Sequence, residues 1–241
     1  MLIGVVWCPN RLSETAQGKG NQKMIKIENT IVPHGEQWES LILGARNPMN
    51  SWDRSDSGWV DFEDWDCGHG IPDGMGNAYV IGDNDLDLMT RLSKAGTDHR
   101  KFMRMIVVYA DVIAPRYWWT EFDTYKIGTV ANSCSTMHKI HEKEFALDDF
   151  SFEYLEDKEM AAYLIDYLNA LRNCFNNEHK KSDWYQMIQL LPQSYNQKRT
   201  VMLNYEVLKN MYHSRKAHKL TEWQEFCSWI ENLPYSELIT Q

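Results

Sequence analysis

The sequence predicts an α+β protein whose strands lie mainly in its first half and whose helices fill its second half. Residues 24–32 alternate apolar and polar side chains, which is the pattern of a strand in a half-buried sheet. Residues 102–112 form an apolar run long enough to cross a sheet. From Asp157 onward, apolar residues recur at spacings of three and four, which is typical of helices that bury one face. We therefore expect an antiparallel or mixed sheet flanked by long helices.

The chain is long enough for one large domain, and we expect residues 1–241 to form a single domain. An N-terminal extension, residues 1–23, begins with a short candidate strand. Residues 47–82 are rich in Asn, Asp, Gly and Pro with interspersed Trp residues, which indicates an ordered loop insertion. Residues 157–232 are expected to form a helical half.

Helix-capping and helix-breaking residues set the expected limits of the other elements. Three helices are expected in the first half: 36–46, 84–95 after a cap at Asp83 or Asn84, and a segment that begins at Pro115. Residues 128–136 interrupt the periodicity with Gly128 and short hydroxyl side chains, as a loop does. In the helical half, apolar stripes mark four helices, at 161–175, 184–191, 201–212 and 220–230.

The charge balance restricts the possible partners. A formal net charge of −9 and a pI near 5.4 argue against duplex nucleic acid, because duplex binding needs a basic face. The densest basic run, residues 198–219, indicates a solvated face or a local anion site suited to a small phosphate-bearing ligand. The N-terminus lacks a basic leader and no stretch reaches the ~20 apolar residues of a membrane span, so we expect a cytoplasmic protein without a membrane partner.

No metal site is expected. The five cysteines are odd in number and far apart, without a CxxC pair, which argues against zinc and against a disulfide framework. An acidic cluster before His69 (Asp61, Glu63, Asp64 and Asp66) lacks the ligand spacing of a calcium loop. A solvated acidic surface is the favoured interpretation.

Aromatic residues are abundant, with 10 Trp and 12 Tyr. Aromatic side chains with a polar tip favour half-buried places, so they indicate subunit interfaces, a planar ligand or an aromatic-rich core. Residues 117–119 (Tyr-Trp-Trp) form the densest group. We expect them either to cover a planar ring or to pack into an oligomer core.

No GxGxxG, P-loop, GxSxG or HExxH motif is present. The informative signal is the order of shorter features along the chain: Ala45-Arg46, Gly96, Asp98-His99, Pro115, a hydroxyl-rich segment to Thr136, Leu190-Leu191-Pro192, Asn204, Asn210, Arg215 and Glu222-Trp223. This order resembles that of the flavin-dependent thymidylate synthases (the thymidylate-synthase-complementing family) over roughly residues 24–46 and 84–232. The resemblance implies a thymidylate-synthase-complementing-protein-like fold.

The family's signature, RHRxxSxxxxSxR, aligns without gaps with residues 124–136. Its named positions are occupied here by Thr124, Tyr125, Lys126, Thr129, Cys134 and Thr136, and the family's Arg before its Leu-Pro turn is Ile188. In the family those arginines hold flavin and nucleotide phosphates through a rigid fork that Thr and Ile lack. Four other cations are candidate substitutes: Lys101, Arg104, Arg116 and Arg199.

The resemblance implies an FAD-dependent thymidylate synthase-like methyltransferase that transfers one carbon to C5 of dUMP or a related pyrimidine deoxynucleotide. It also implies NADPH and methylenetetrahydrofolate as co-substrates, and a homotetramer with sites between subunits. It assigns catalysis to Arg215, which would polarise a pyrimidine carbonyl. It assigns cofactor binding to His99, Lys126, Asn204 and Asn210, and substrate binding to Thr129, Cys134, Ser135 and Thr136.

These assignments have structural alternatives. Arg215 is otherwise a surface residue at a helix C-terminus, where the helix dipole favours a cation. His99 is otherwise a turn residue bonded to backbone, and Cys134 is either an activated loop thiol or an inert buried one. For the whole chain, the alternative is a non-catalytic nucleotide-binding or protein-binding homologue that uses the 47–82 insertion and a Trp118-Trp119 surface.

Overall fold

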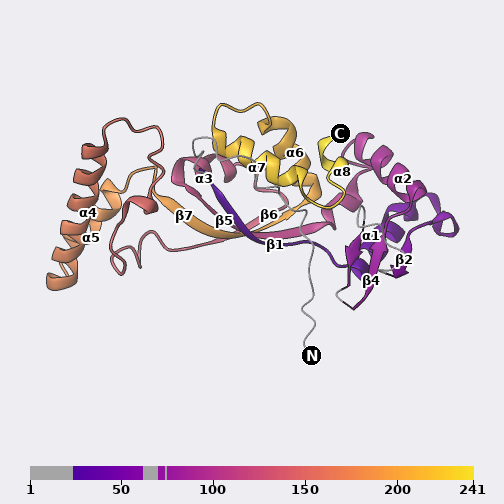
Figure 1. Cartoon of the computed structure of the whole chain (residues 1–241), viewed down its shortest axis with the longest axis horizontal. Helices are drawn as coiled ribbons and strands as arrows, with labels where there is room; N and C mark the ends of the chain where they lie inside the picture. Colours follow the sequence, from indigo (N-terminus) through magenta and orange to yellow (C-terminus); the bar gives the residue numbers. More distant parts are fainter. Residues whose placement is uncertain (1–23, 62–69, 74) are drawn as a thin grey trace.

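A four-stranded antiparallel sheet runs through the middle of the molecule (Figure 1). The structure is a computed structural model, and it describes residues 24–61, 70–73 and 75–241. The strand order is β1 (Lys26–Ile31), β5 (Val107–Pro115), β7 (Asn196–Asn204) and β6 (Thr129–Ser133). A smaller three-stranded sheet has the order β2 (Gly58–Asp61), β4 (Asn77–Val80) and β3 (Ile71–Pro72).

The two central strands, β5 and β7, are paired along their whole length, from Val107 opposite Asn204 to Pro115 opposite Asn196. Every second residue of β5 between Val108 and Ala114 is buried, as are Val201 and Leu203 of β7. Alternation with a period of two places all of these side chains on one face of the sheet. That face carries the main hydrophobic core.

Short helices cover this buried face: α3 (Arg116–Phe122), α6 (Tyr205–Arg215) and α7 (Thr221–Glu231), with α8 (Glu237–Thr240) beside α6 (Figure 1). Their aromatic side chains form the centre of the core, where the Trp118 ring meets Trp119 edge-to-face and lies tilted against Trp223, at ring-centroid distances of 4.9 and 4.8 Å. Trp118 and Trp119 are fully buried inside the chain. The expectations that they form an exposed surface or pack into an oligomer core are therefore wrong.

At one end of the sheet, α1 (Gly35–Arg46) and α2 (Asp83–Lys94) pack with the smaller sheet (Figure 1). The 47–82 insertion is more regular than the expected loop. It holds two short 3₁₀ helices, η1 (Asn47–Met49) and η2 (Trp52–Arg54), as well as strands β2, β3 and β4. Trp65 and most of the acidic cluster, from Glu63 to His69, lie outside the described residues, as does the candidate strand at 2–7.

At the opposite end, α4 (Lys158–Glu178) and α5 (Lys181–Leu190) form a helical arm (Figure 1). The Asp157 side chain caps α4 by accepting a hydrogen bond from the Met160 N–H at 3.0 Å. Leu168, Leu171 and Met187 belong to a small core separate from that of the sheet. The longest helix of the expected helical half thus projects from the sheet instead of flanking it.

Several local expectations are corrected by the structure. Residues 196–204 form β7 where a helix was expected from Val201, and residues 129–133 form an edge strand where a loop was expected. The first part of the 102–112 run belongs to a 3₁₀ helix, η3 (Lys101–Arg104). Gly82, not Asp83 or Asn84, occupies the N-cap position of α2. Within the described part of the chain, no helix is long and apolar enough to cross a membrane.

Candidate functional site

Arg215 lies where the end of α6 meets the end of α3. It occupies the last turn of its helix, where the helix dipole favours a cation. Its Nη1 donates to Oε2 of Glu121 at 2.6 Å, and its Nε donates to the Tyr125 hydroxyl at 2.8 Å. Tyr125 occupies the histidine position of the family signature, so Arg215 and the signature segment are in direct contact within one chain.

Aromatic rings form the floor beneath Arg215. Its guanidinium carbon lies 4.8 Å from the centre of the Trp223 ring and 5.5 Å from that of the Tyr125 ring. Cation–π contacts of this kind favour a fixed guanidinium over a mobile one. The Trp223 ring is fully buried and its Nε1 donates to Oε2 of Glu121 at 3.0 Å. The two aromatic rings and the Glu121 carboxylate together hold the Arg215 guanidinium in place.

Glu121 is the residue at which these contacts converge. Its Oε2 accepts hydrogen bonds from Arg215 and Trp223, and Nε2 of His218 lies 3.4 Å away. Nδ1 of His218 accepts a hydrogen bond from the Leu220 N–H at 3.2 Å, which places the ring proton of a neutral His218 on Nε2, facing Glu121. Sequence reasoning missed Glu121. The available signal was an acidic residue one helical turn before Tyr125.

The polar groups of this Arg215 cluster (Arg215, Glu121, Tyr125, His218 and Trp223) are partly open to solvent. The exposed fractions of the side chains are 19% for Arg215, 34% for Glu121 and 25% for His218. A ligand can therefore reach the guanidinium and the carboxylate, while Trp223 stays covered. Such a partly buried cation beside an acceptor suits recognition of a small polar ring.

A second carboxylate, which is buried, belongs to the residue before Trp223. Glu222, at the start of α7, is almost fully buried and accepts a hydrogen bond from the Tyr117 hydroxyl. Burial, followed by the hydrogen bond to Glu222, raises the pKa of Tyr117 well above its usual range. Tyr117 thus remains a neutral donor at any physiological pH. The pair joins α3 to α7 behind the Arg215 cluster.

The segment after Tyr125 turns sharply towards the start of α6. Gly128 has φ +82°, and a Cβ atom at this position would lie 2.7 Å from Nδ2 of Asn204. Asn204 caps α6, because its Oδ1 accepts a hydrogen bond from the Val207 N–H at 2.9 Å. The Thr129 hydroxyl donates to the carbonyl of Tyr125, and Lys126 is exposed on the turn.

The remaining predicted substrate residues lie at the far end of β6. The Cys134 N–H donates to the Lys198 carbonyl at 2.9 Å, and Oγ of Ser135 accepts from the His138 N–H at 2.9 Å in a tight turn. A strand advances ~3.3 Å per residue, so Cys134 lies about 16 Å from Thr129 along β6. Among the described residues, the hydrogen bond of Thr129 to the Tyr125 carbonyl joins it to the Arg215 cluster, whereas the bonds formed by Cys134 and Ser135 run to other residues.

His99 lies at a separate pocket near the other end of α6. This pocket, of about 470 Å³, is lined by Gly44, Ala45, Pro48, Met49, Leu92, Asp98, His99, Lys101 and Phe102. Most of these lining residues are apolar, and Asp98, His99 and Lys101 add polar groups. The His99 N–H bonds to the Gly96 carbonyl at 3.2 Å, and the residue is exposed.

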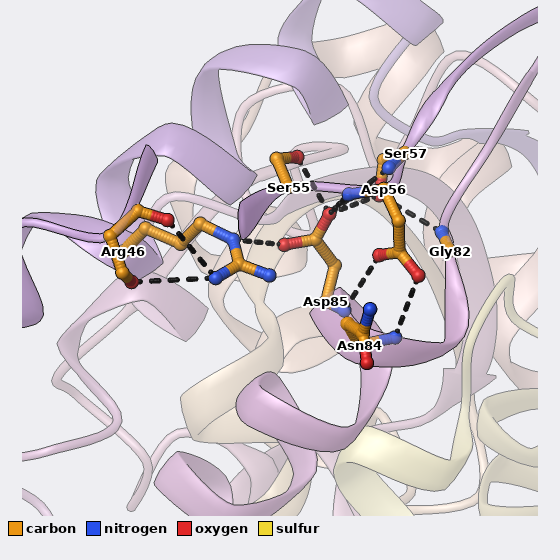
Figure 2. Close-up of polar contacts among 8 residues, drawn as sticks. Arg46, Ser55, Asp56, Ser57, Gly82, Asn84 and Asp85 are labelled. Carbon is orange, nitrogen blue, oxygen red and sulfur yellow. Dashed lines mark hydrogen bonds and ion pairs between the residues drawn. The ribbon is translucent and has the colours of Figure 1, made fainter. Parts of the chain in front are cut away.

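A buried ion pair fixes the helices that form this pocket (Figure 2). Arg46, 4% exposed, donates from Nε to Oδ1 of Asp85, which is 1% exposed. The other carboxylate oxygen of Asp85 accepts from the side chains of Ser55 and Ser57 and from the backbone N–H groups of Asp56 and Ser57. Burial alone would raise the pKa of Asp85, but the bonds from Ser57, Ser55 and Arg46 outweigh it and lower that pKa.

The ion pair ties the 47–82 insertion to both helices. Arg46 closes α1 and Asp85 lies in the first turn of α2. The Asp56 carboxylate caps α2 by accepting from the backbone N–H groups of Asn84 and Asp85 (Figure 2). Ala45 of the pocket directly precedes Arg46, so the network positions the pocket wall.

Several of the cations considered as phosphate ligands are already paired. Glu206, in the first turn of α6, accepts from Arg104 and, at 3.4 Å, from Arg100. Burial would raise the pKa of Glu206, but the two guanidinium groups lower it overall.

Asn210, further along α6, is exposed. A helix rises 1.5 Å per residue, so about 16 Å separates the Asn204 end of α6 from Arg215.

The other candidate substitutes lie elsewhere. Arg199 bonds to Asp123 at 2.7 Å and stacks on the Trp119 ring at 4.3 Å. Arg116 donates to the Leu191 carbonyl at 3.4 Å. Lys101 is the one candidate that lines the His99 pocket. The candidate ligand sites considered among the described residues are therefore the Arg215 cluster and the His99 pocket.

The comparisons with known proteins define the fold. No protein-family model and no curated protein matches the sequence. Two solved structures of thymidylate synthase X (ThyX), a flavin-dependent thymidylate synthase from Helicobacter pylori, are similar to the chain, each with FAD and dUMP. One has a TM-score of 0.62 at 15% identity and covers 90% of this chain and 95% of its own. The other has a TM-score of 0.60 at 17% identity, with coverages of 88% and 97%.

The similarity extends over nearly the whole of both chains, so this protein has the α+β fold of ThyX. The fold implied by the order of short features in the sequence is confirmed, and the main sheet is antiparallel.

Proposed function

We propose that this chain is a flavin-dependent thymidylate synthase-like enzyme that binds a pyrimidine deoxynucleotide at the Arg215 cluster and transfers one carbon to C5 of its base. The observation that carries the proposal is the direct contact of Arg215 with Tyr125 in the signature segment, on a chain with the ThyX fold. The ThyX structures with FAD and dUMP support this class of ligand.

Arg215 has the chemistry needed to act on a pyrimidine carbonyl. A guanidinium that is held in place stabilises negative charge that develops on the carbonyl oxygen, and it does so without reorganising during the reaction. The rings of Trp223 and Tyr125 and the carboxylate of Glu121 supply that fixed position. Thr129, next to this cluster, is proposed to contact the nucleotide.

The His99 pocket fits part of an FAD molecule. Its volume of about 470 Å³ lies within the range of small-molecule sites, and its apolar wall suits a planar ring. His99 and Lys101 would contact the cofactor there, and Lys126, Asn204 and Asn210 are the further residues proposed to hold it. FAD, when bound, supplies the electrons that reduce the transferred carbon. NADPH and methylenetetrahydrofolate complete the proposed reaction as co-substrates.

We propose an oligomer with sites between protomers, as the family resemblance implies. Cys134, Ser135 and Thr136 form no hydrogen bond with the Arg215 cluster among the described residues, and we propose that they contribute to the site of a neighbouring protomer. The face of the sheet opposite the helices offers a contact surface, because Ile31, Tyr109, Met202 and Val130 are consecutive cross-strand neighbours on it. Tyr109 and Val130 are 45% and 59% exposed. We propose that a second copy of the chain covers this stripe in a homotetramer.

Ligand-induced stabilisation tests the nucleotide proposal. We expect dUMP or dCMP to raise the Tm of the wild-type protein and Arg215→Ala to abolish this rise, because any ligand of the native state stabilises it. Arg91→Ala is the matched control, since Arg91 forms an exposed ion pair with Asp87 on α2. An unchanged nucleotide response in a folded Arg215→Ala protein removes Arg215 from the site.

One observation favours a second function. The guanidinium groups of Arg100, Arg104 and Arg215 are paired with carboxylates of the same chain, and the three signature arginines are replaced by Thr124, Lys126 and Thr136. This pattern suits a non-catalytic homologue that binds a nucleotide or a protein. Titration with FAD separates the two functions. A flavin absorption spectrum retained after gel filtration supports the enzyme, and a colourless protein that nucleotides still stabilise supports the second function.

A further inference from the structure

The Arg215 cluster pairs fixed donors with a fixed acceptor. Oε2 of Glu121 accepts from Arg215 and Trp223, and Nε2 of His218 lies 3.4 Å from the same oxygen, whereas Oε1 accepts none of the hydrogen bonds formed by the described residues. The side chain is 34% exposed, so Oε1 can accept from a ligand. A carboxylate ion-paired with a guanidinium offers lone pairs and no donor.

The order of hydrogen-bond donors and acceptors along the edge of a pyrimidine base determines whether the base is complementary to Arg215 and Glu121. Cytosine presents two adjacent acceptors, O2 and N3, followed by the N4 amine as donor, whereas uracil presents one N3–H donor flanked by the acceptors O2 and O4. Nε of Arg215 donates to Tyr125 and one N–H of Nη1 donates to Glu121. The second N–H of Nη1 and the N–H groups of Nη2 form no hydrogen bond with the described residues, so they are the adjacent donors in the planar fork, with Glu121 as an acceptor beside them. That sequence of donors and acceptor is complementary to cytosine.

Uracil fits the same groups less well. A carboxylate that accepts from the uracil N3–H also faces a carbonyl oxygen on each side, and the lone pairs repel. The Trp223 donor cannot relieve this repulsion, because it is directed at Oε2 of Glu121, and Nε2 of His218 lies 3.4 Å from that same oxygen. An amide in place of the carboxylate would offer a donor as well as an acceptor, which is what uracil requires.

We infer that the base bound at the Arg215 cluster is cytosine, so that the substrate class is a cytosine deoxynucleotide such as dCMP, with Glu121 as the residue that selects it. This inference depends on the function proposed above, because it assumes that the cluster binds a pyrimidine nucleotide. In this arrangement Glu121 accepts a hydrogen bond from the N4 amine, and Arg215 donates hydrogen bonds to N3 and O2.

Calorimetric titration of the full chain with dCMP and with dUMP tests the inference. For the wild-type protein we expect a Kd for dCMP at least about tenfold below that for dUMP, since a matched base contact discriminates by that factor or more. Glu121→Gln should bring the ratio to one or reverse it. Glu178→Gln is the matched control, because Glu178 is an exposed, ion-paired glutamate at the end of a helix, and it should leave the ratio unchanged.

The outcomes separate the inference from the function on which it depends. Tighter binding of dUMP, equal binding of the two nucleotides, or a dCMP preference that survives Glu121→Gln overturns the inference and leaves nucleotide binding intact. Failure of the wild-type protein to bind any pyrimidine deoxynucleotide overturns both. A Tm for Glu121→Gln close to that of wild type, without ligand, establishes that the altered ratio does not arise from unfolding.

Discussion

Replacement of Asp85 by alanine should strongly destabilise the end of the molecule that holds the His99 pocket. The Asp85 carboxylate is buried, ion-paired with Arg46, and accepts from the side chains and backbone of residues 55–57. Its removal leaves the buried guanidinium of Arg46 without its carboxylate. Loss of one partner from a buried pair costs ~3–5 kcal/mol. We expect about 3 kcal/mol, since water can enter beside residues 51–57.

The assay is thermal and chemical unfolding of the purified protein. A loss of about 3 kcal/mol corresponds to a fall in Tm of roughly 6–12 °C for a chain of this length. Asp87→Ala, on the same helix, is the control, because Asp87 and Arg91 form an ion pair with both side chains 66% exposed. That change should cost less than about 0.5 kcal/mol. Equal effects of the two substitutions would refute the assignment of the Arg46–Asp85 pair as a structural anchor.

The pH dependence gives an independent measure of the same pair. The folded-state pKa of Asp85 is lowered, so its stabilising effect is complete above the unfolded-state pKa near ~4 and is lost as the pH falls towards the folded value. The difference in unfolding free energy between wild type and Asp85→Asn should therefore be constant from pH 7 to pH 5. It should narrow below about pH 4. A difference that grows on acidification would contradict the lowered pKa.

Two further substitutions test other parts of the structure. Tyr117→Phe removes the donor to buried Glu222 and should lower the unfolding free energy by ~1–3 kcal/mol, whereas Tyr163→Phe, at a side chain 68% exposed, should have no measurable effect. Leu168→Ala should destabilise the α4–α5 arm by ~2–5 kcal/mol. Hydrogen exchange should then accelerate in residues 158–190 and stay slow in β5 and β7; uniform acceleration would show that the arm and the sheet unfold together.

Much of the fold could be predicted from local patterns. The strand at β1 and the helices α1, α2 and α7 follow from alternation, apolar spacing and breaking residues, and the structure places them within a few residues of the expected limits. In each of these elements the apolar residues repeat at a clear spacing, and a capping or helix-breaking residue marks the end. Both signals can be recognised from the local sequence, because each depends only on residues that are neighbours in the chain.

Strand β7 was not predicted because a helical spacing and a strand alternation of apolar residues overlap at its C-terminal end. Val201, Tyr205, Leu208 and Tyr212 have helical spacing, but Val201 and Leu203 alternate with polar or half-buried residues as a strand does. Asn204 marks the change, since it ends β7 and caps α6. Pairing with β5, more than 80 residues away at Asp111 and Thr200, decides the outcome and is invisible to local spacing.

The candidate site was only half predictable for the same reason. Arg215 was identified through its position in the order of short features. Its partner Glu121 is 94 residues away in the sequence, and the ion pair between Arg46 and Asp85 spans 39 residues. Such pairs are set by the packing of α3 against α6 and of α1 against α2. A single sequence does not record which charges those packings bring together.

Photocrosslinking with 5-iodo-dCMP and 5-iodo-dUMP tests most directly whether the Arg215 cluster binds the nucleotide. A base bound at the cluster would lie beside its aromatic side chains, so mass spectrometry should locate the adduct in peptides that contain Tyr125, His218 or Trp223. Excess unlabelled nucleotide should suppress this adduct. An adduct that is suppressed in the same way but lies on residues 44–49 or 98–102 of the His99 pocket would contradict the account.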